Sequence, residues 1–600
     1  MEYKNREEVP AKYKWDLSYR YKDIETWNDS LNHIENKMHN IEKYRGKIME
    51  SPESLYNLLE EYFKYENEII RLLCYIECKL DENLSDKKSI QLDKKMKNLY
   101  TSFFSMCSFI EPEILKSNIE TINNYIASYE PLKKYEYYLR DMLRLQDHIL
   151  DEGTKKIVSS LSKGYSSLNY ISSNLLNAEI NYGTIQDENG ETIQLISNKI
   201  RKYMKSPDRE VRKKVYIQAN EARKQFENTF GTNLSTYMSF QHELAKIEKY
   251  ENLKHSSFEE SNIPYEVNET LYKVVEKRID VYYDYFRKMA GFLNVDKLCE
   301  YDKSANPFKL EKQYTIEEAQ KLIKEATSIF GKEYSEVINK AFADNWIDYC
   351  SYKGKANGAY CLLNYGDHPC ILVNYQYGLE DVSTIVHELG HAVNSYFIQE
   401  KNYAHNYSTD HILAEIASLT NEIIFTNYLI NISDDVDEKK TCIYRLLDTI
   451  QNNLFDACLE GKLENIIYAK LANNEVVSTQ EFNDTIVDLK KQYYGDTVQL
   501  DEYSHLSWIP RQHYFAPFYL YKYAISVCVA CYIGTRIANG DNDMKESYLK
   551  FLHLGNNDTP VNTLRSVGID LLDEKLYDSA IDYFDEMLQK LYELSRCINE

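Results

Sequence analysis

The sequence predicts a mainly α-helical protein with at least two lobes. The chain has 600 residues, which is too long for one hydrophobic core. Only 19 glycines and 11 prolines interrupt it, and the helix-favouring residues Leu, Ile, Lys and Glu are plentiful. Hydrophobic residues make up 43% of the chain and charged residues 28%, a mixture typical of soluble globular domains.

The pattern of residues 1 to about 180 predicts successive amphipathic helices. Between residues 55 and 76, for example, apolar side chains recur at helical spacing and fall on one face. A break follows near residues 180–205, where Asn189-Gly190 between short β-favouring segments predicts a hairpin. We therefore predict an N-terminal helical lobe of residues 1–200 and a second lobe, carrying the chemistry described below, of residues 201–600.

The region 350–378 differs from its helical surroundings. Two short strands are expected there, separated by the polar turn Gly366-Asp367-His368-Pro369. A helix then begins near Glu380-Asp381, since acidic residues suit a helix N-terminus. From there to residue 600 the pattern is helical again, with breaks at 431–438, around Pro510 and at 555–560.

Charge and cysteine usage exclude several partners. The formal charge of −23 disfavours nucleic acid, which needs clustered positive charge, and gives no attraction to an anionic membrane. The N-terminus is charged, and the longest apolar run, residues 524–533, is shorter than the roughly 20 residues that span a bilayer. The 12 cysteines are scattered, and Cys528 and Cys531 lie in an apolar helical run. We expect a cytoplasmic protein with reduced thiols.

The motif His387-Glu388-Leu389-Gly390-His391 carries the chemistry. It lies inside an apolar stripe at helical spacing, so His387 and His391 share one helix face and can both reach one tetrahedral zinc ion. Glu388 sits one step round the helix, where it can touch a zinc-bound water without ligating the metal. The spacing therefore predicts one zinc ion per chain, with Glu388 as general base.

A zinc site of this kind needs a third protein ligand. The pattern HExxHxxGxxH fails, because its later positions hold Asn394 and Phe397. Glu415 is the expected ligand, since it projects from an apolar helical segment where an unpaired carboxylate would be costly. Glu422, seven residues on, could orient a ligand histidine through its second ring nitrogen. Rival ligands remain open, and they are His405, His411, Glu400 and Asp410.

The mechanism follows from the metal. Zinc lowers the pKa of a bound water to about 7 and polarises a carbonyl, while Glu388 moves the proton to the leaving amine. The oxyanion also needs hydrogen-bond donors. The segment 510–523 is dense in imidazole and phenol groups, and the candidates are His513, Tyr514, Tyr519, Tyr521 and Tyr523.

The chain resembles the oligoendopeptidase F group of the M3, thimet oligopeptidase-like, zinc peptidases. The match runs over most of the chain, with order and spacing preserved. It is carried by Trp15-Asp16-Leu17, Gly354 to Tyr360, His368-Pro369 with Ile371 to Tyr375, the zinc motif, Glu415 to Ser418 with Asn421-Glu422, His513 with Phe518 to Tyr523, Gly555 to Pro560 and Gly568 to Asp570.

The resemblance implies a two-lobed helical body that encloses a deep substrate channel, with a small sheet beside the zinc helix and zinc on the channel floor. The strand 371–375, with Asn374, would bind substrate backbone by strand addition. Gly358, Ala359 and Tyr360 would sit beside it, and Tyr519 and Tyr523 would contact substrate.

The chain departs from the family pattern at two positions. Asn394 replaces a frequent histidine that is not a ligand in this group. His513-Tyr514-Phe515 replaces the usual His-Phe-Tyr. The phenol role therefore falls to Tyr514, or to one of the tyrosines at 519, 521 and 523.

The resulting hypothesis is a zinc metalloendopeptidase that cuts internal bonds of short, unstructured oligopeptides. Alternatives are a zinc carboxypeptidase or dipeptidase, a non-catalytic peptide-binding protein, and a metal-dependent hydrolase of another substrate. The sequence leaves open the cleavage preference, the metal used in the cell, and whether the chain is a monomer or a homo-oligomer.

Overall fold

The computed structural model describes residues 3–308, 310 and 312–596, and it is mainly α-helical with three small sheets in that part of the chain. The predicted fold class is confirmed in this respect. Two compact units emerge, each built from three chain segments. Unit 1 comprises Met1–Ile149, Lys312–Tyr428 and Ile533–Gly568, and unit 2 comprises Leu150–Glu311, Leu429–Tyr532 and Ile569–Glu600.

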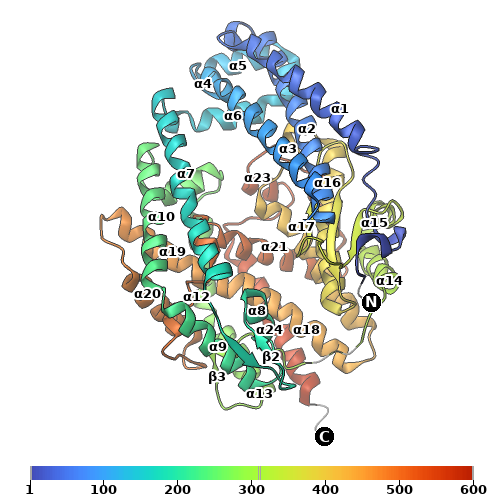
Figure 1. Cartoon of the computed structure of the whole chain (residues 1–600), viewed down its shortest axis with the longest axis vertical. Helices are drawn as coiled ribbons and strands as arrows, with labels where there is room; N and C mark the ends of the chain where they lie inside the picture. Colours follow the sequence, from blue (N-terminus) through green and yellow to red (C-terminus); the bar gives the residue numbers. More distant parts are fainter. Residues whose placement is uncertain (1–2, 309, 311, 597–600) are drawn as a thin grey trace. The chain divides into compact units, whose positions relative to one another are not determined.

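The helices follow one another along the chain as Figure 1 shows. Those of unit 1 are α1 (Ile24–Lys37), α2 (Pro52–Glu82), α3 (Lys87–Met106), α4 (Ile110–Leu115), α5 (Ile119–Ser128), α6 (Glu136–Arg144), α14 (Ile316–Thr327), α15 (Lys332–Ala343), α16 (Leu379–Lys401), α22 (Asn542–Leu552) and α23 (Pro560–Arg565), and α17 (His411–Ile432) begins there. Those of unit 2 are α7 (Glu152–Asn174), α8 (Ser197–Tyr203), α9 (Arg209–Lys224), α10 (Glu227–Ile247), α11 (Leu253–Glu260), α12 (Glu266–Lys277), α13 (Ile279–Phe292), α18 (Val436–Ile450), α19 (Ala457–Ala472), α20 (Thr479–Tyr494) and α24 (Glu574–Arg596), and α21 (Leu520–Ala538) begins there.

The N-terminal helices of unit 1 confirm the amphipathic reading. Helix α2 begins with Ser51, whose side chain caps the first turn, and with Pro52, whose missing N–H costs nothing at that position. Leu55, Leu58 and Leu59 on its predicted apolar face are fully buried against the neighbouring helices. This packing forms the main core of unit 1.

A three-stranded sheet lies beside helix α16 in unit 1. Its strands are β4 (Ile347–Cys350), β5 (Tyr360–Leu362) and β6 (Cys370–Tyr375), in the order β4-β6-β5. Strand β6 pairs parallel with β4 and antiparallel with β5, and it contacts α16. The predicted sheet next to the metal-motif helix is therefore confirmed, with one strand, β4, that the sequence reading had missed.

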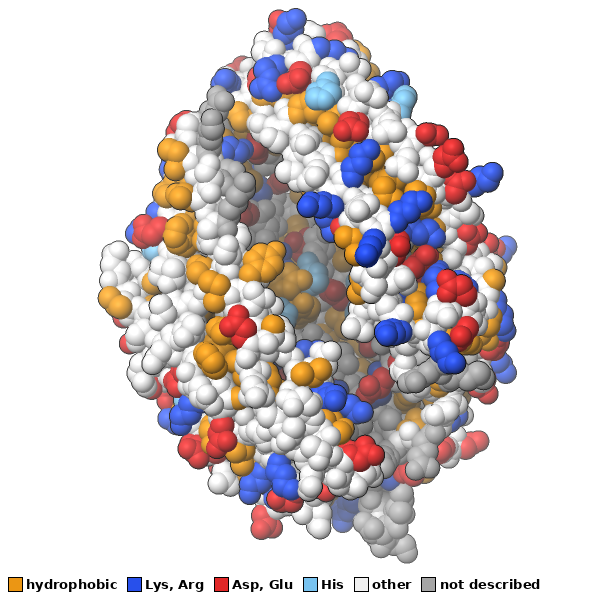
Figure 2. All heavy atoms as spheres, viewed as in Figure 1, with side chains coloured by type: hydrophobic (Ala, Val, Ile, Leu, Met, Phe, Trp, Pro, Cys, Tyr) orange, Lys and Arg blue, Asp and Glu red, His pale blue; other side chains and the backbone are white. Residues whose placement is uncertain are grey.

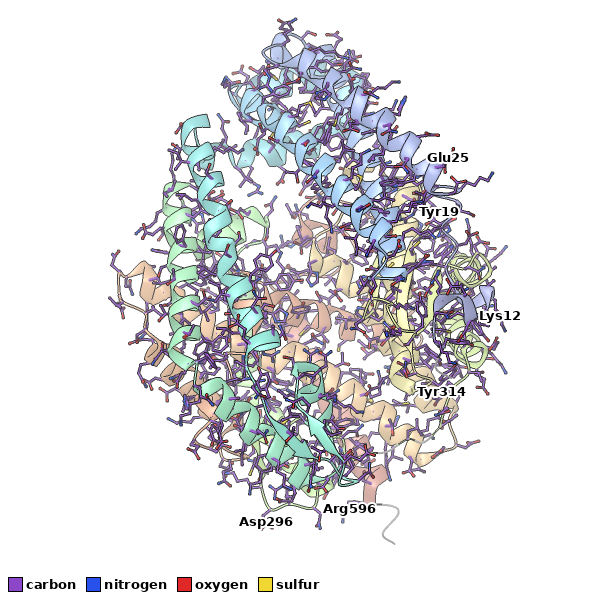
Figure 3. The ribbon with its side chains drawn as sticks, in the orientation of Figure 1. Lys12, Tyr19, Glu25, Asp296, Tyr314 and Arg596 are labelled. Carbon is purple, nitrogen blue, oxygen red and sulfur yellow. The ribbon has the colours of Figure 1, made fainter. Side chains whose placement is uncertain are left out.

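Both ends of β6 are anchored by tyrosine hydroxyls. Tyr19 donates to the carbonyl of His368, just before β6, at 2.7 Å. Tyr375, at the end of β6, donates to the carbonyl of Tyr314 at 2.9 Å. Tyr19 and Tyr314 are labelled in Figure 3, and they come from segments almost 300 residues apart in the chain. The sheet is thus held by residues distant in sequence.

Unit 2 contains the predicted hairpin, with β1 (Thr184–Gln186) paired antiparallel to β2 (Thr192–Gln194). Strands β3 (Leu298–Cys299) and β7 (Val498–Gln499) form a short parallel pair. The hairpin lies within unit 2, so the compact units differ from the single boundary expected near residue 200. Local breaks in a sequence mark where elements end, whereas the units are assembled from contacts between distant segments.

Three features of the described residues relate to the sequence interpretation. None of the described helices is long and apolar enough to cross a membrane. Acidic and basic side chains are interspersed over the face shown in Figure 2. Cys528 and Cys531 are buried in α21, in agreement with their interpretation as core residues.

Candidate metal centre

Helices α16 and α17 approach each other closely at Gly390, the residue before the second motif histidine. A Cβ atom at this position would lie 2.5 Å from Cα of Ser418 and 2.8 Å from the carbonyl oxygen of Ala417. Only glycine fits such an approach without displacing backbone. The contact is reinforced by Asn421, whose side-chain amide donates to the carbonyl of Val386 at 3.2 Å. The helix pair therefore brings the motif face against the first turns of α17.

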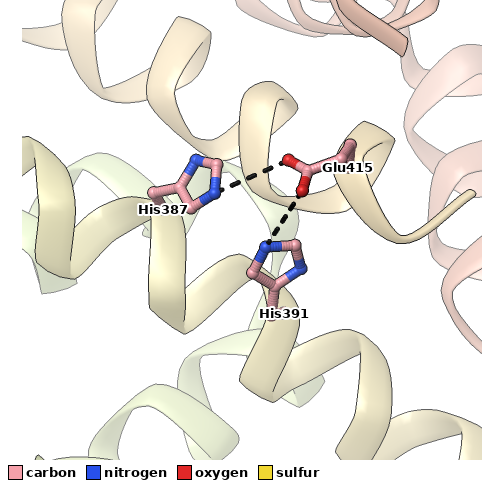
Figure 4. Close-up of side chains that lie close together, drawn as sticks. All are labelled: His387, His391 and Glu415. Atoms are coloured by element: carbon pink, nitrogen blue, oxygen red, sulfur yellow. Dashed lines mark ion pairs between the residues drawn. The ribbon is translucent and has the colours of Figure 1, made fainter. Parts of the chain in front are cut away.

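Three predicted ligands converge where the two helices meet. Nε2 of His387 lies 3.6 Å from Oε2 of Glu415, and Nε2 of His391 lies 3.8 Å from Oε1 of the same carboxylate. Figure 4 shows both rings and the carboxylate directed toward one another. Ligands bound tetrahedrally at about 2.0 Å lie about 3.3 Å apart, so two nitrogens and one oxygen at these distances fit a zinc ion. All the ligand atoms lie within 4.8 Å of one another.

Glu422 holds the ring of His387 from the opposite side. Its Oε1 lies 2.7 Å from Nδ1 of His387. A carboxylate oxygen only accepts, so Nδ1 carries the proton and Nε2 is left facing the cluster. Burial lowers the pKa of His387, but the hydrogen bond and charge of Glu422, with the charge of Glu415, outweigh it and raise the pKa to about 9. The surroundings thus favour positive charge at this point.

The imidazole of His391 lies in surroundings that shift its pKa in the direction opposite to that of His387. Burial, followed by the charges of His387 and His411, lowers the pKa of His391 to about 3. A neutral imidazole is the form that binds a metal, because its free nitrogen keeps a lone pair. His391 is therefore prepared as a ligand over the whole range of neutral pH.

Glu388 is buried beside the cluster. Burial, opposed by the charge of His387 and reinforced by those of Glu415 and Glu422, raises its pKa to about 7. A carboxyl group that titrates near neutral pH can both accept and donate a proton. Burial and the charge of Glu388 also raise the pKa of the Cys361 thiol in strand β5, and β5 contacts helix α16.

Three of the four rival ligands lie in other surroundings, whereas His411 lies near the site. Nε2 of His405 lies 2.8 Å from the carbonyl oxygen of Lys134, and a carboxylate oxygen of Asp410 accepts from the backbone N–H of Ile412 at 2.8 Å. Glu400 lies in a different cluster, with His553. His411 does approach the site, with Nε2 3.9 Å from Oε1 of Glu415.

Ser418 also lies at the centre and was not assigned a role from the sequence. Its hydroxyl lies 3.1 Å from Oε2 of Glu415 and 3.0 Å from the carbonyl oxygen of Glu415, so it steadies the ligand carboxylate. His411, expected only as a rival ligand, lies one turn before Glu415 on the same helix. A spacing of three residues from a ligand on one helix is the signal that could have found Ser418.

The sheet corrects one sequence expectation. Strand β6, expected to add a substrate strand, is the central strand and is paired on both sides at residues 371 and 372. The two edge strands are β4 and β5, and β5 is preceded by the exposed Gly358 and Ala359. Asn374 does not point to a free edge, because its amide donates to the carbonyls of Ala356 at 3.0 Å and Gly358 at 2.9 Å. Its observed contacts position the loop that leads into β5.

Tyr360 begins the edge strand but directs its phenol away from the sheet edge. The hydroxyl donates to Oδ2 of Asp81 in α2 at 2.5 Å, and the ring packs against the main core of unit 1. A direct side-chain contact of Tyr360 with substrate gains no support from this orientation. Its backbone remains part of the edge.

The segment 510–523 lies in unit 2 and separates its aromatic residues into two groups. His513 is half-buried, with its ring centroid 6.2 Å from that of Tyr519 and 5.9 Å from that of Tyr523. Burial and the charge of Arg511 lower the pKa of His513, which favours its neutral form. These three rings are partly exposed and lie close to one another.

Tyr514 and Tyr521 form the second, buried group. Tyr514 is fully buried, with its hydroxyl 3.5 Å from the carbonyl oxygen of Glu460, and Tyr521 is 2% exposed and stacks on Phe258. Side chains in a closed core cannot reach a substrate without rearrangement. The structure therefore gives no support to the catalytic role predicted for these two tyrosines.

Two imidazoles and one carboxylate on two packed helices, with a buried carboxyl group that titrates near neutral pH beside them, form the arrangement of metal-dependent peptidases. Comparisons with known proteins agree. The sequence model of peptidase family M3 matches residues 202–583, and that of oligopeptidase F matches residues 113–182. The chain therefore belongs to peptidase family M3, in its oligoendopeptidase F group, and is a metalloendopeptidase.

Individual relatives cover almost the whole chain. Group B oligopeptidase PepB of Streptococcus agalactiae is 28% identical over 591 residues, which is 98% of both chains. Oligopeptidase PepF of Bacillus subtilis is 28% identical over 98% of this chain and 88% of its own. A solved structure of a candidate peptidase from Chlamydophila abortus has a TM-score of 0.91 at 28% identity, covering 98% of this chain and 100% of that one.

Proposed function

We propose that this protein is a zinc-dependent endopeptidase that hydrolyses internal bonds of short, unstructured oligopeptides. The proposal rests chiefly on the convergence of His387, His391 and Glu415 within 4.8 Å, with Glu388 buried beside them. Two imidazoles and one carboxylate leave a further coordination position for water or substrate. A peptide-binding protein without catalysis would have no use for Glu388.

The three ligand residues would hold the ion, and Glu422 would keep Nε2 of His387 turned toward it. Bound zinc would supply a Lewis acid for the scissile carbonyl and lower the pKa of a coordinated water to about 7. Ser418 limits the motion of the Glu415 carboxylate through its hydroxyl. This donor set of nitrogen and oxygen favours zinc over manganese.

Glu388 performs the proton transfers. Its carboxylate accepts a proton from the attacking water and then donates it to the amine nitrogen of the leaving product. A pKa of about 7 suits both steps, because neither protonation state is strongly favoured at neutral pH.

Strand β5 offers the edge along which a peptide backbone can pair. Strand β5 contacts helix α16, which carries Glu388, so a strand added at this edge would run beside the motif helix. Pairing through main-chain hydrogen bonds requires an extended, unfolded substrate. Pairing of this kind would allow peptides of many sequences to bind, because backbone groups are common to all peptides.

His513, Tyr519 and Tyr523 are the proposed donors to the developing oxyanion and to the substrate. The assignment is supported by the family resemblance and by the partial exposure of these three rings. A neutral imidazole can donate one hydrogen bond without the cost of burying a charge. The substrates are oligopeptides, the compartment is the cytoplasm, and nucleic acids and membranes are not partners.

Cleavage of an internally quenched peptide of about ten residues tests the function. Products are identified by mass, with and without a chelator. Internal cuts that a chelator abolishes and zinc restores are expected. Trimming from one end would instead identify a carboxypeptidase or dipeptidase, and absence of cleavage by a zinc-loaded protein would favour a binding protein.

A further inference from the structure

A second group of metal-binding residues lies in unit 1, at the far end of the motif helix. It consists of Glu333 at the start of α15, Glu400 near the end of α16 and His553 directly after α22. Nε2 of His553 lies 3.4 Å from Oε1 of Glu333 and 4.0 Å from Oε2 of Glu400. Three elements that are distant in sequence thus direct nitrogen and oxygen atoms toward one point.

The imidazole of His553 is held in one orientation. Its Nδ1 lies 2.8 Å from the carbonyl oxygen of Leu549, and its ring stacks on Phe397 with centroids 4.5 Å apart. The carbonyl of His553 accepts from the side chain of Asn402 at 2.8 Å. Because a carbonyl oxygen only accepts, Nδ1 carries a proton and Nε2 is the atom presented to the carboxylates.

The charge balance of this group calls for a cation. Nε2 of His553 is a buried atom that makes no hydrogen bond. Among the described residues, the ion pairs of Glu333 and Glu400 are with this ring alone. A neutral ring would direct its lone pair at two negative carboxylates, which is unfavourable unless a positive charge lies between them.

The geometry favours a bound metal as that positive charge. The distances of 3.4 and 4.0 Å are close to the 3.6 and 3.8 Å found at His387, His391 and Glu415. A ring that donates Nδ1–H to a backbone carbonyl while exposing Nε2 is also the usual arrangement of a metal-binding histidine. One nitrogen and two carboxylate oxygens suit zinc and related divalent ions.

We propose that Glu333, Glu400 and His553 bind a second divalent transition-metal ion, of the zinc class, in a structural site. The ion would link α15, the end of α16 and the segment after α22. Glu400 lies 13 residues beyond His387 on the same helix, a rise of about 20 Å. The site is therefore separate from the catalytic cluster, and it would restrain the helix that carries the motif.

Metal counting by titration of the chelator-treated full-length protein with Zn²⁺ tests the proposal. The unmodified chain should bind two ions, and His553→Gln and Glu400→Gln should each bind one. Glu336→Gln is the matched control, because Glu336 is an exposed carboxylate on α15 outside the cluster, and it should still bind two. Both carboxylates of the cluster are exposed, so their replacement by glutamine leaves the fold intact.

The same metal counting in a Glu415→Ala variant distinguishes the two proposed metal sites. Glu415→Ala removes a proposed catalytic ligand and should leave one ion, which the additional change His553→Gln removes, with at least a tenfold loss of Zn²⁺ affinity. Co²⁺ absorption in the same variants reports the ligand field directly. A count that His553→Gln leaves unchanged in both backgrounds overturns the proposal and identifies the cluster as an ion pair. Failure of the catalytic assignment alone would leave the His553-dependent ion in place.

Discussion

The helix pair α16–α17 in unit 1 and the segment 510–523 in unit 2 both concentrate the polar residues expected to act in the reaction. In the helix pair, His387, His391 and Glu415 gather at one place, and their ligand atoms lie within 4.8 Å of one another. In the segment, His513, Tyr519 and Tyr523 are partly exposed while two other tyrosines are buried.

The difference comes from local geometry. Helical spacing of four residues fixes which side chains share a face before any tertiary contact forms. The segment 510–523 instead passes through a short 3-10 turn, Gln512–Phe515, and a left-handed residue, Phe518, before α21 begins. Its side-chain directions depend on packing against other helices. The following changes test this contrast, from the largest expected effect to the smallest.

Replacing Glu415 by Ala should abolish both metal binding at the cluster and turnover. Two imidazoles alone bind zinc weakly, because the third ligand and its charge are lost. Metal content after dialysis and peptide cleavage measure the two effects. Full occupancy of the cluster together with normal cleavage would show that another residue, with His411 as the nearest candidate, is the third ligand.

Glu388→Gln should reduce kcat by about 10²–10⁴-fold while metal content stays unchanged, because only the proton-transfer group is removed. Steady-state cleavage of the quenched peptide and metal analysis of the same sample provide the check. The amide keeps the size of the side chain. A variant that retains more than about a tenth of the activity would exclude Glu388 as the base.

Substitutions in the segment 510–523 should lower kcat only where the replaced side chain is partly exposed. His513→Gln, Tyr519→Phe and Tyr523→Phe each remove a donor, and the one that binds the oxyanion should lose about 10²-fold in kcat. Tyr514→Phe and Tyr521→Phe serve as controls and should keep kcat within about threefold, since their hydroxyls are buried. The reverse pattern in the measured kcat would mean that the buried pair becomes exposed during the reaction.

Gly390→Ala should destabilise the folded protein by about 1–3 kcal/mol, because the new methyl group meets backbone atoms of α17. The displaced helix should also weaken metal binding. Gly291→Ala is the control, since a Cβ there meets nothing within 4 Å, and it should be neutral or slightly stabilising. Chemical unfolding of both variants distinguishes close packing from a general effect of removing glycine.

The buried Glu464 should make the stability of the folded protein depend on pH, and the Glu464→Gln variant should lack this dependence. Burial, opposed by a hydrogen bond from the backbone N–H of Phe518, raises the pKa of Glu464 to about 8 from an ordinary 4.5. The folded chain therefore keeps a proton that the unfolded chain releases. This stability is full below pH 4.5 and is lost as the pH rises through 8, by at most about 1.4 kcal/mol per pH unit.

Thermal unfolding of the unmodified protein and of Glu464→Gln between pH 5 and 9 measures this effect. The midpoint of the unmodified protein should fall relative to the variant as the pH rises. Parallel curves would show that Glu464 is already ionised in the folded state. The prediction concerns the support of Phe518, whose φ of 51° is unusual for a residue with a side chain.

The sequence by itself determined the helical class, the hairpin at 184–194 and the placement of both motif histidines on one helix face. Periodicity and turn residues act over a few positions, so one chain segment contains the necessary information. Glu415 and Glu422 were also expected, from their positions in an apolar helical segment and from the family resemblance. The structure places Glu415 against both histidines and Glu422 against His387.

Only the tertiary structure decided which strand forms the sheet edge, which tyrosines of 510–523 are buried, and which chain segments build each unit. It also brought Glu400, a rival zinc ligand in the sequence, to Glu333 and His553 instead. These outcomes depend on contacts between segments that are up to several hundred residues apart. The close approach at Gly390 is the clearest case, because the glycine is visible in the sequence but its partner, Ser418, is not.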